Sequence, residues 1–401
     1  MSCYASTHAA VSPLSLTFRA PCVNAHTNAR AARAFETFGE SGYTLRFDLH
    51  ANYSEVAMSR NSETFFETFL RRQDEAAWAH ALESLLPAIH EVDRNATSIW
   101  FAFFPLALAR AFEQSDEPEK LAQRLLMQGA YRLDDQIDSS HVFLYGHRHW
   151  PEVKRAVVAL AAQFKEETPG ENALAGHIRG VAREVAAQKK VEESLLLGIT
   201  AIAFMTLRQV GLAAFAASPG EVRLDGKRAR QTPEKILQER ARDDSQGLLG
   251  FLRTTDKRWT VVWNEDDPTA RFQMIHHQEV ASAAATDKRD WSQVDPRCTI
   301  DEGPIPVQCR SASCGTCWVG VLGGAEKLTP VSPRERKAMQ LFGYIDTDDS
   351  QPIIRLACQA QGEGAVSIVI PSWNGVFGKY LRRVREEEAA EAAAASQAVS
   401  Q

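Results

Sequence analysis

The sequence predicts a multidomain protein, with an all-α N-terminal domain and an α+β C-terminal domain. Three observations support this prediction. The chain has 401 residues, and at roughly 100–200 residues per domain two domains are expected. Apolar residues recur at helical spacing from about Ser62 to Arg253, without a β-rich run. From Trp259 onward, short β-rich runs, turn residues and a group of cysteines replace that pattern.

The composition limits the classes of protein that this chain can belong to. Hydrophobic residues make up 44% and charged residues 24%, which is typical of a soluble globular protein and excludes a polytopic membrane protein. The formal net charge of −6 argues against nucleic acid as a partner, because such binding depends on neutralising phosphates. Five of the seven cysteines lie from Cys298 onward, and such clustering in a mid-sized chain favours a metal site over disulfides.

Both ends of the chain are expected to be disordered tails, over residues 1–45 and 386–401. Residues 1–35 contain no Asp or Glu and carry arginines among Ser, Thr and Ala. This composition is typical of an organellar transit peptide, and also fits a disordered bacterial tail or a misassigned start codon. We therefore expect a cytoplasmic protein, or one of an organellar matrix or stroma if residues 1–35 are a targeting segment.

The helical domain is expected over residues 55–250, with six or more helices. Its later periodic stretches are Leu121–Leu133, Val153–Phe164, Ile178–Val191 and Leu195–Ala217. The uninterrupted part of the last stretch, Leu195–Leu207, has 13 residues and covers only ~20 Å, so it predicts a central buried helix rather than a transmembrane span. The strongly polar residues 221–245 are expected to form an exposed connection or an amphipathic helix.

The C-terminal domain is expected over residues 256–385 and begins with a hairpin. The β-rich runs Trp259–Trp263 and Arg271–Ile275 flank a polar turn. One of the helices expected in this domain begins after Ser332. Ser332 is placed as its N-cap, and Glu335 follows at the third helical position. The elements expected after the hairpin are a helix over Glu279–Lys288, a strand over Trp318–Leu322, a helix over Ser332–Leu341 and a strand over Ala365–Ile370.

Four cysteines give the strongest functional signal in the sequence. Cys309, Cys314 and Cys317 have the spacing C-x4-C-x2-C, and Cys358 follows 41 positions later. This spacing is typical of plant-type [2Fe–2S] ferredoxins. Two bridged irons need four thiolates, so a tight loop supplies three ligands and a distant segment returns the fourth. Small residues between the first three cysteines leave backbone N–H groups free to point at the negative cluster.

Residues 259–378, about 120 of the 401, resemble the [2Fe–2S] ferredoxin family. The Cys-Arg…Cys-Gly-Thr-Cys core and the Leu-Ala-Cys-Gln return are similar in residues and in order. The helix Ser332–Phe342 resembles the insertion of the adrenodoxin-like branch, whereas the four-residue spacing matches the plant-type branch. The resemblance implies a β-grasp fold and one [2Fe–2S] cluster. It also implies the iron ligands, which are Cys309 and Cys314 on one iron and Cys317 and Cys358 on the other.

One position departs from this family. Many members have glycine where this chain has Ala312, and a positive φ there would cost an alanine about 1 kcal/mol. The alternative to a cluster is a zinc site, for which two C-x2-C pairs would be expected, but the sequence has only one. Cys298 lies outside the pattern and is expected to be a small core or surface residue.

A second polar segment lies in the helical domain and contains Asp134, Asp138, His141, His147 and His149. On a helix, the first three of these residues share a face, where they can hold a hard cation or a metal–diphosphate. The two later histidines alternate, so both can face one metal from a strand or loop. The Asp-Asp-x-x-Asp string is similar to the aspartate-rich motif of isoprenoid synthases, although the paired arginines that usually follow it are absent. The alternative is a polar helix end and a loop.

These features predict an electron carrier, in which the helical domain docks a partner or mediates oligomerisation. One alternative is a redox enzyme whose helical domain binds a substrate or a second metal or cofactor fed by the cluster. Another is an interaction scaffold with a structural cluster. Neither a Gly-x-Gly-x-x-Gly nor a Walker A string is present, so a separate reductase or electron acceptor protein is the expected partner. In the adrenodoxin-like branch, the region after the insertion helix carries acidic residues that face the reductase. The corresponding region of this chain contains Asp346, Asp348 and Asp349, which are therefore expected to dock a reductase. The alternative is a solvated acidic loop without a role in docking.

Overall fold

The computed structural model describes residues 63–103, 133–166, 170, 172–224, 228–243, 257–292, 298–341 and 349–371. All of them belong to the second of two compact units, Met1–Ser62 and Glu63–Gln401. The expected tails 1–45 and 386–401 lie outside the described residues. So do Asp346, Asp348 and all of the expected helix Leu121–Leu133 except its last residue.

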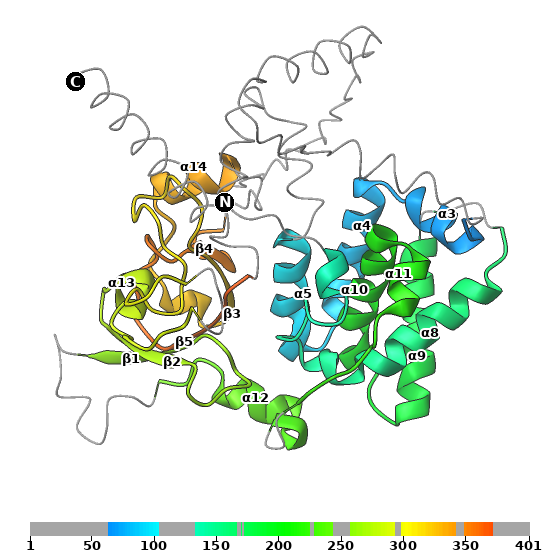
Figure 1. Ribbon diagram of the computed structural model, residues 1–401, viewed down its shortest axis with the longest axis horizontal. Helices are drawn as coiled ribbons and strands as arrows, with labels where there is room; N and C mark the ends of the chain where they lie inside the picture. Colours follow the sequence, from blue (N-terminus) through cyan, green and yellow to red (C-terminus); the bar gives the residue numbers. More distant parts are fainter. Residues whose placement is uncertain are drawn as a thin grey trace, which may run out of the picture. The chain divides into compact units, whose positions relative to one another are not determined.

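The first part of this unit is helical (Figure 1). Its described helices are α3 (Phe65–Arg71), α4 (Glu75–Leu85), α5 (Glu91–Phe103), α8 (Trp150–Gln163), α9 (Ala173–Lys189), α10 (Ser194–Val210), α11 (Leu212–Ala217) and α12 (Pro233–Glu239), with short 3-10 segments between some of them. The predicted helices over Val153–Phe164 and Ile178–Val191 are confirmed as α8 and α9. The predicted Leu195–Ala217 helix is divided at Gly211, whose φ of 81° ends α10.

Helix α10 is the central element of the helical part. Every residue from Leu195 to Leu207 is buried, as its apolar sequence predicts. The helix contacts α3, α4, α5, α8, α9 and α11. Within the part of the chain that the structure describes, no helix combines the length and the apolar character that crossing a membrane requires.

In its described residues, the second part forms one mixed five-stranded sheet and two α-helices. Its elements are β1 (Arg258–Val262), β2 (Arg271–Ile275), α13 (Val280–Ala284), β3 (Trp318–Gly323), α14 (Pro333–Leu341), β4 (Ile354–Leu356) and β5 (Val366–Val369). The strand order is β2-β1-β5-β3-β4, with β1 and β5 parallel and the other pairs antiparallel. The predicted hairpin, both helices and two later strands are confirmed, although α13 is shorter than expected and β4 was not predicted.

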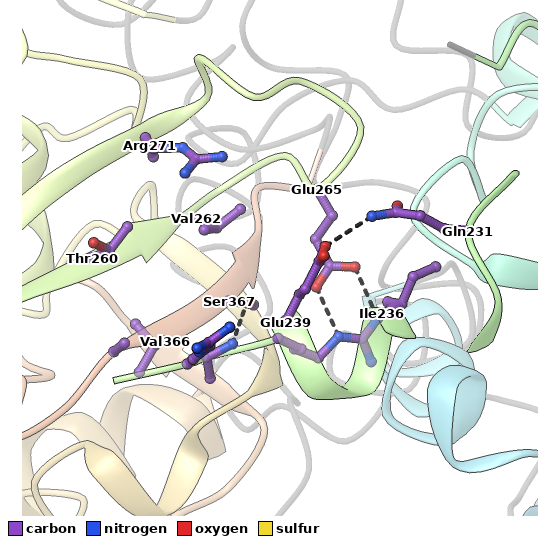
Figure 2. Close-up of a pocket in the computed structure, with 13 residues that line it drawn as sticks. Gln231, Ile236, Glu239, Thr260, Val262, Glu265, Arg271, Val366 and Ser367 are labelled. Atoms are coloured by element: carbon purple, nitrogen blue, oxygen red, sulfur yellow. Dashed lines mark hydrogen bonds and ion pairs between the residues drawn. The ribbon is translucent and has the colours of Figure 1, made fainter. Parts of the chain in front are cut away.

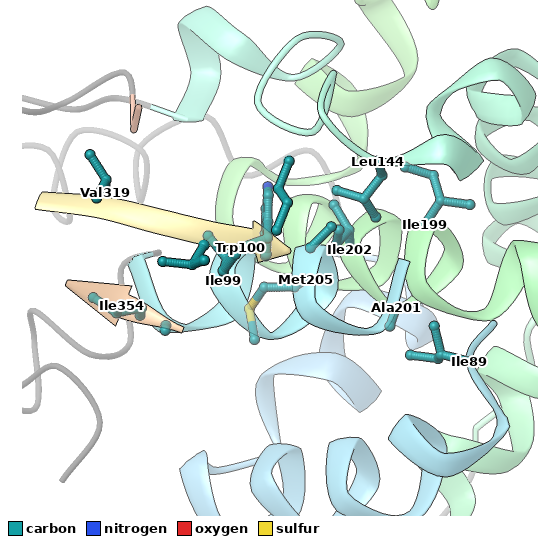
Figure 3. Close-up of a cluster of buried hydrophobic side chains, with 14 of the residues drawn as sticks. Ile89, Ile99, Trp100, Leu144, Ile199, Ala201, Ile202, Met205, Val319 and Ile354 are labelled. Atoms are coloured by element: carbon teal, nitrogen blue, oxygen red, sulfur yellow. The ribbon is translucent and has the colours of Figure 1, made fainter. Parts of the chain in front are cut away.

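One helix of the helical part packs against the sheet. Ile99 of α5 packs against β3 at Gly320, and Ile99, Trp100 and Val319 belong to one continuous buried cluster (Figure 3). Asn95 Nδ2 donates to the carbonyl oxygen of Leu322 at 3.4 Å. Because α5 contacts β3, this strand is buried almost throughout, whereas β2 alternates between exposed and buried residues.

The segment after α12 ties the two parts together. Arg240 pairs with Glu265 through its Nε and Nη2 atoms at 2.7 and 2.9 Å, and its Nη1 donates to the carbonyl oxygen of Val92 at 2.9 Å. The backbone N–H of Ala241 donates to Ser367 Oγ at 3.1 Å. Residues 221–245 were expected to form an exposed connection or an amphipathic helix, and α12 provides a helix with Ile236 buried. The expectation of exposure is wrong for the side chain of Arg240 and for Ala241, because long-range partners cover both. Whether residues 256–385 fold alone stays a prediction.

Glycine at position 320 is required by the packing of α5 on β3. A Cβ added there would lie 2.5 Å from Ile99 Cγ2 and 2.9 Å from Val369 Cγ1. We expect Gly320→Ala to lower the free energy of unfolding by about 1–3 kcal/mol, because the core is overpacked. Gly320→Ala combined with Ile99→Ala should cost less than the sum of the two single changes, as measured by urea denaturation in a double-mutant cycle.

The matched control is Gly180→Ala in α9, where an added Cβ meets nothing within 4 Å. It should stabilise the helix by roughly 0.5–1 kcal/mol. Strict additivity of the Ile99 and Gly320 changes would contradict the contact between α5 and β3.

Candidate functional site

The sheet positions the four predicted cysteine ligands. Cys309, Cys314 and Cys317 lie in the loop that leads into β3, and Cys358 comes two residues after β4. Strands β3 and β4 are antiparallel with Trp318 opposite Leu356, and the Ala357 N–H donates to the Cys317 carbonyl oxygen at 2.9 Å. This register brings the distant segment back to the loop. Cys314, Cys317 and Cys358 are buried, whereas Cys309 is only half-buried.

The four thiols are in contact as two pairs. Cys314 hydrogen-bonds to Cys309, which lowers the pKa of Cys309 to about 3 and raises that of Cys314. Cys317 hydrogen-bonds to Cys358, which raises the pKa of Cys317 and lowers that of Cys358.

Loop N–H and hydroxyl groups surround these sulfurs. The backbone N–H of Ser311 donates to Cys309 Sγ at 3.4 Å, and that of Ala312 donates to the sulfur of Cys358. The Thr316 hydroxyl lies 3.2 Å from Cys314 Sγ. These dipoles stabilise negative charge on sulfur, as thiolate ligation requires.

The loop reaches this geometry through left-handed backbone conformations. The φ values are 52° at Arg310, 58° at Ala312 and 66° at Gly315. Ala312 therefore has the positive φ that would cost an alanine about 1 kcal/mol relative to glycine. Its N–H is directed at Cys358 at the cost of a conformation that glycine adopts more readily.

Replacing Ala312 by glycine is expected to stabilise the protein by about 1 kcal/mol, because it removes this backbone strain. Thermal or urea unfolding measures the change. The control is Ala159→Gly, at an exposed position of α8, which should destabilise by about 1 kcal/mol. Equal destabilisation by both changes would contradict a strained loop at position 312.

In the described ranges, no three His, Cys, Asp or Glu side chains gather as a site for a single metal ion. A [2Fe–2S] cluster differs from such a site, because each iron takes two protein thiolates and two bridging sulfides. Cys298, as expected, lies outside the group, and its buried thiol donates to the Pro304 carbonyl oxygen at 3.1 Å.

The predicted helical face of Asp134, Asp138 and His141 is wrong. Residues Leu133–Gln136 form a 3-10 segment and turns follow it, so spacing on an α-helix does not apply. The side chain of Asp134 lies outside the described residues. The Asp138 carboxylate accepts hydrogen bonds from Trp150 Nε1 at 2.7 Å and from the Gly220 N–H at 2.8 Å, so it has a structural role.

The structure does bring two of the predicted histidines together. Nδ1 of His141 lies 2.9 Å from Nδ1 of His147, and both side chains are buried. Burial lowers the pKa of His147 to about 4 and that of His141 well below its ordinary value, so both imidazoles are neutral at pH 7. His149 is half-buried and lies two residues further along the 3-10 segment Tyr145–His149. With three residues per turn, His147 and His149 point to different sides, contrary to the expectation of a shared metal.

Lys154 was not predicted as a site residue, although its side chain lies beside Asp138 and Ser218. Its Nζ donates to the Ser218 carbonyl oxygen, lies 2.6 Å from Ser218 Oγ and is 3.8 Å from Asp138 Oδ1. Burial lowers its pKa, and the Asp138 carboxylate opposes that effect. The signal was present in the sequence, because Lys154 falls on the apolar side of α8 between Val153 and Val157.

A cavity of about 330 Å³ lies between α12 and strands β1, β2 and β5 (Figure 2). Two pairs of its charged and polar lining residues bind each other. Glu265 pairs with Arg240, and Gln231 Nε2 donates to Glu239 at 2.8 Å. We therefore assign this cavity to the structural connection between the helices and the sheet, and not to a ligand site.

Of the three acidic residues expected to face a reductase, only Asp349 is described. It is exposed, its carboxylate accepts from the Gln351 N–H at 2.9 Å, and its carbonyl oxygen accepts from Arg336 at 3.3 Å. Its role in docking stays a prediction.

No family model, curated protein or solved structure matches this chain.

Proposed function

We propose that this chain is a one-electron carrier whose C-terminal part binds one [2Fe–2S] cluster. The observation that carries the proposal is the contact of four thiols in two pairs, Cys309 with Cys314 and Cys317 with Cys358. A two-iron cluster needs this division of ligands, because each iron takes two thiolates. The same pairing follows from the resemblance to [2Fe–2S] ferredoxins.

The sheet supports a β-grasp, ferredoxin-type assignment of residues 256–385. The chain forms a hairpin and a helix, and its first and last strands run parallel at the centre of a mixed sheet. The ligand loop leads into β3, and the fourth ligand follows β4. The helix α14 lies between the third and fourth ligands, as the resemblance implies.

The residues of the site would have distinct tasks. The four thiolates hold the irons, and when bound the cluster accepts and releases one electron. The N–H groups of Ser311 and Ala312 offset the negative charge that reduction adds. Burial of three ligands limits contact with water, while half-buried Cys309 marks the edge where a separate reductase or acceptor protein can approach.

Anaerobic reconstitution with iron and sulfide tests this function. Iron and acid-labile sulfide should each reach about two per chain, with visible absorption. Zinc at one per chain without visible absorption would overturn the proposal.

A further inference from the structure

The side-chain amide of Gln359 contacts the fourth cysteine of the candidate site. Its Nε2 donates to the carbonyl oxygen of Cys358 at 2.8 Å and lies 3.6 Å from the sulfur of the same residue. A primary amide has two N–H donors, so one can bind the oxygen while the other is directed at the sulfur. Cys358 Sγ therefore receives a side-chain donor in addition to the backbone N–H of Ala312.

The turn that carries Gln359 is held by the elements on both sides of it. The backbone N–H of Gln359 donates to the carbonyl oxygen of Leu356, the last residue of β4, at 2.8 Å. The N–H of Val280, the first residue of α13, donates to the carbonyl oxygen of Ala360 at 2.9 Å. The backbone of this residue is thus fixed between β4 and α13, which keeps the amide close to the sulfur.

A donor at this sulfur acts on the charge of the site. Reduction adds one negative charge to a cluster and its thiolates, so a hydrogen bond to a ligand sulfur stabilises the reduced form more than the oxidised form. Cys358 is fully buried, and a hydrogen bond is electrostatically stronger in such surroundings than in water. Removing this donor is therefore expected to make reduction less favourable.

We propose that Gln359 is a positioning residue of the candidate cluster site and that its N–H bond to Cys358 Sγ raises the reduction potential. This inference rests on the proposed function, because it concerns the same four ligands. The alternative is that the amide only satisfies the Cys358 carbonyl oxygen. In that case its loss would lower the stability of the fold and leave the reduction potential unchanged.

Spectroelectrochemical titration of the reconstituted full-length protein tests the proposal. Gln359→Leu keeps a side chain of similar size and removes the donor. We expect the equilibrium constant for reduction to fall by about three- to tenfold, which corresponds to a potential lower by about 28–59 mV for one electron. Gln359→Glu at pH 8 replaces the donor by a carboxylate and adds a negative charge, so it should lower the potential further than Gln359→Leu.

The matched control is Gln351→Leu. Gln351 is also half-buried, but its Nε2 donates to the carbonyl oxygens of Glu326 and Leu328, at 3.2 and 2.9 Å. This change removes two amide hydrogen bonds that do not involve sulfur, and should alter the equilibrium constant for reduction less than about twofold, or about 18 mV.

Two results would overturn the inference while leaving the proposed function in place. One is a loaded cluster whose potential changes by less than about 18 mV in Gln359→Leu, and the other is an equal shift in Gln359→Leu and Gln351→Leu. A wild-type chain that takes up no cluster would instead overturn the proposed function, and this inference with it. The iron and sulfide content of the wild type therefore separates the two kinds of failure.

Discussion

Replacing Cys317 by alanine is expected to abolish cluster binding, with iron falling from about two per chain to nearly none. Cys317 is 1% exposed and is the last cysteine before β3. Alanine removes one thiolate, and no water or nearby side chain can easily replace it in this buried place. Its partner Cys358 would then hold an iron alone, which leaves that iron without the coordination it needs. Iron and acid-labile sulfide analysis after anaerobic reconstitution measures the effect.

The control for this change is Cys298→Ala. Cys298 is also buried, at 2% exposure, but its thiol donates to the Pro304 carbonyl oxygen instead of contacting the four ligands. The Cys298 variant should keep about two irons per chain. Retention of iron in both variants would contradict the assignment of Cys317 as a ligand.

Breaking the ion pair between Arg355 and Glu335 is expected to lower the free energy of unfolding by about 3–5 kcal/mol. Both side chains are fully buried, and they meet at 2.9 and 3.0 Å. Glu335 Oε1 also accepts from the Leu356 N–H at 2.8 Å. The pair thus fastens the first turn of α14 to β4, three residues before Cys358. Arg355→Met leaves the carboxylate buried without its counter-ion, and urea denaturation measures the cost.

Two comparisons separate this effect from a general loss of charge. The exposed pair Arg183–Glu193 has side chains 71% and 32% exposed, so Arg183→Met should cost less than about 1 kcal/mol. Arg355→Met together with Glu335→Leu should recover much of the lost stability, because no buried charge is left unpaired. A cost below about 1 kcal/mol for Arg355→Met alone would show that the pair does not fasten α14 to β4.

Local patterns predicted the elements that depend on neighbours in sequence. The hairpin β1–β2 follows from two β-rich runs around a polar turn, and α14 begins at Ser332, whose Oγ accepts from the Glu335 N–H at 3.1 Å. Strand β4 was missed because it has only three residues, which become a strand by pairing with β3. Its short length and the preceding Pro352 hide that pairing in the sequence.

The errors in the helical part have similar physical causes. Periodicity does not distinguish an α-helix from a 3-10 segment with turns, so the shared face of Asp134, Asp138 and His141 was wrong. Arg240 lies in a strongly polar stretch, and only its distant partners Glu265 and Val92 explain why it is buried. Cys309, Cys314 and Cys317 lie close together because their spacing is a local property of the loop, whereas the return of Cys358 depends on the pairing of β3 with β4. That these four cysteines bind a cluster stays a prediction.

Electron paramagnetic resonance of the reduced, reconstituted protein tests the central claim most directly. A reduced [2Fe–2S] cluster has a single unpaired electron, so we expect a spin-one-half signal that integrates to about one spin per two irons. The signal should be absent in Cys317→Ala and present in Cys298→Ala. Reconstituted protein that shows no such signal after reduction, whether it holds zinc or iron, would contradict the assignment of Cys309, Cys314, Cys317 and Cys358 to one [2Fe–2S] cluster.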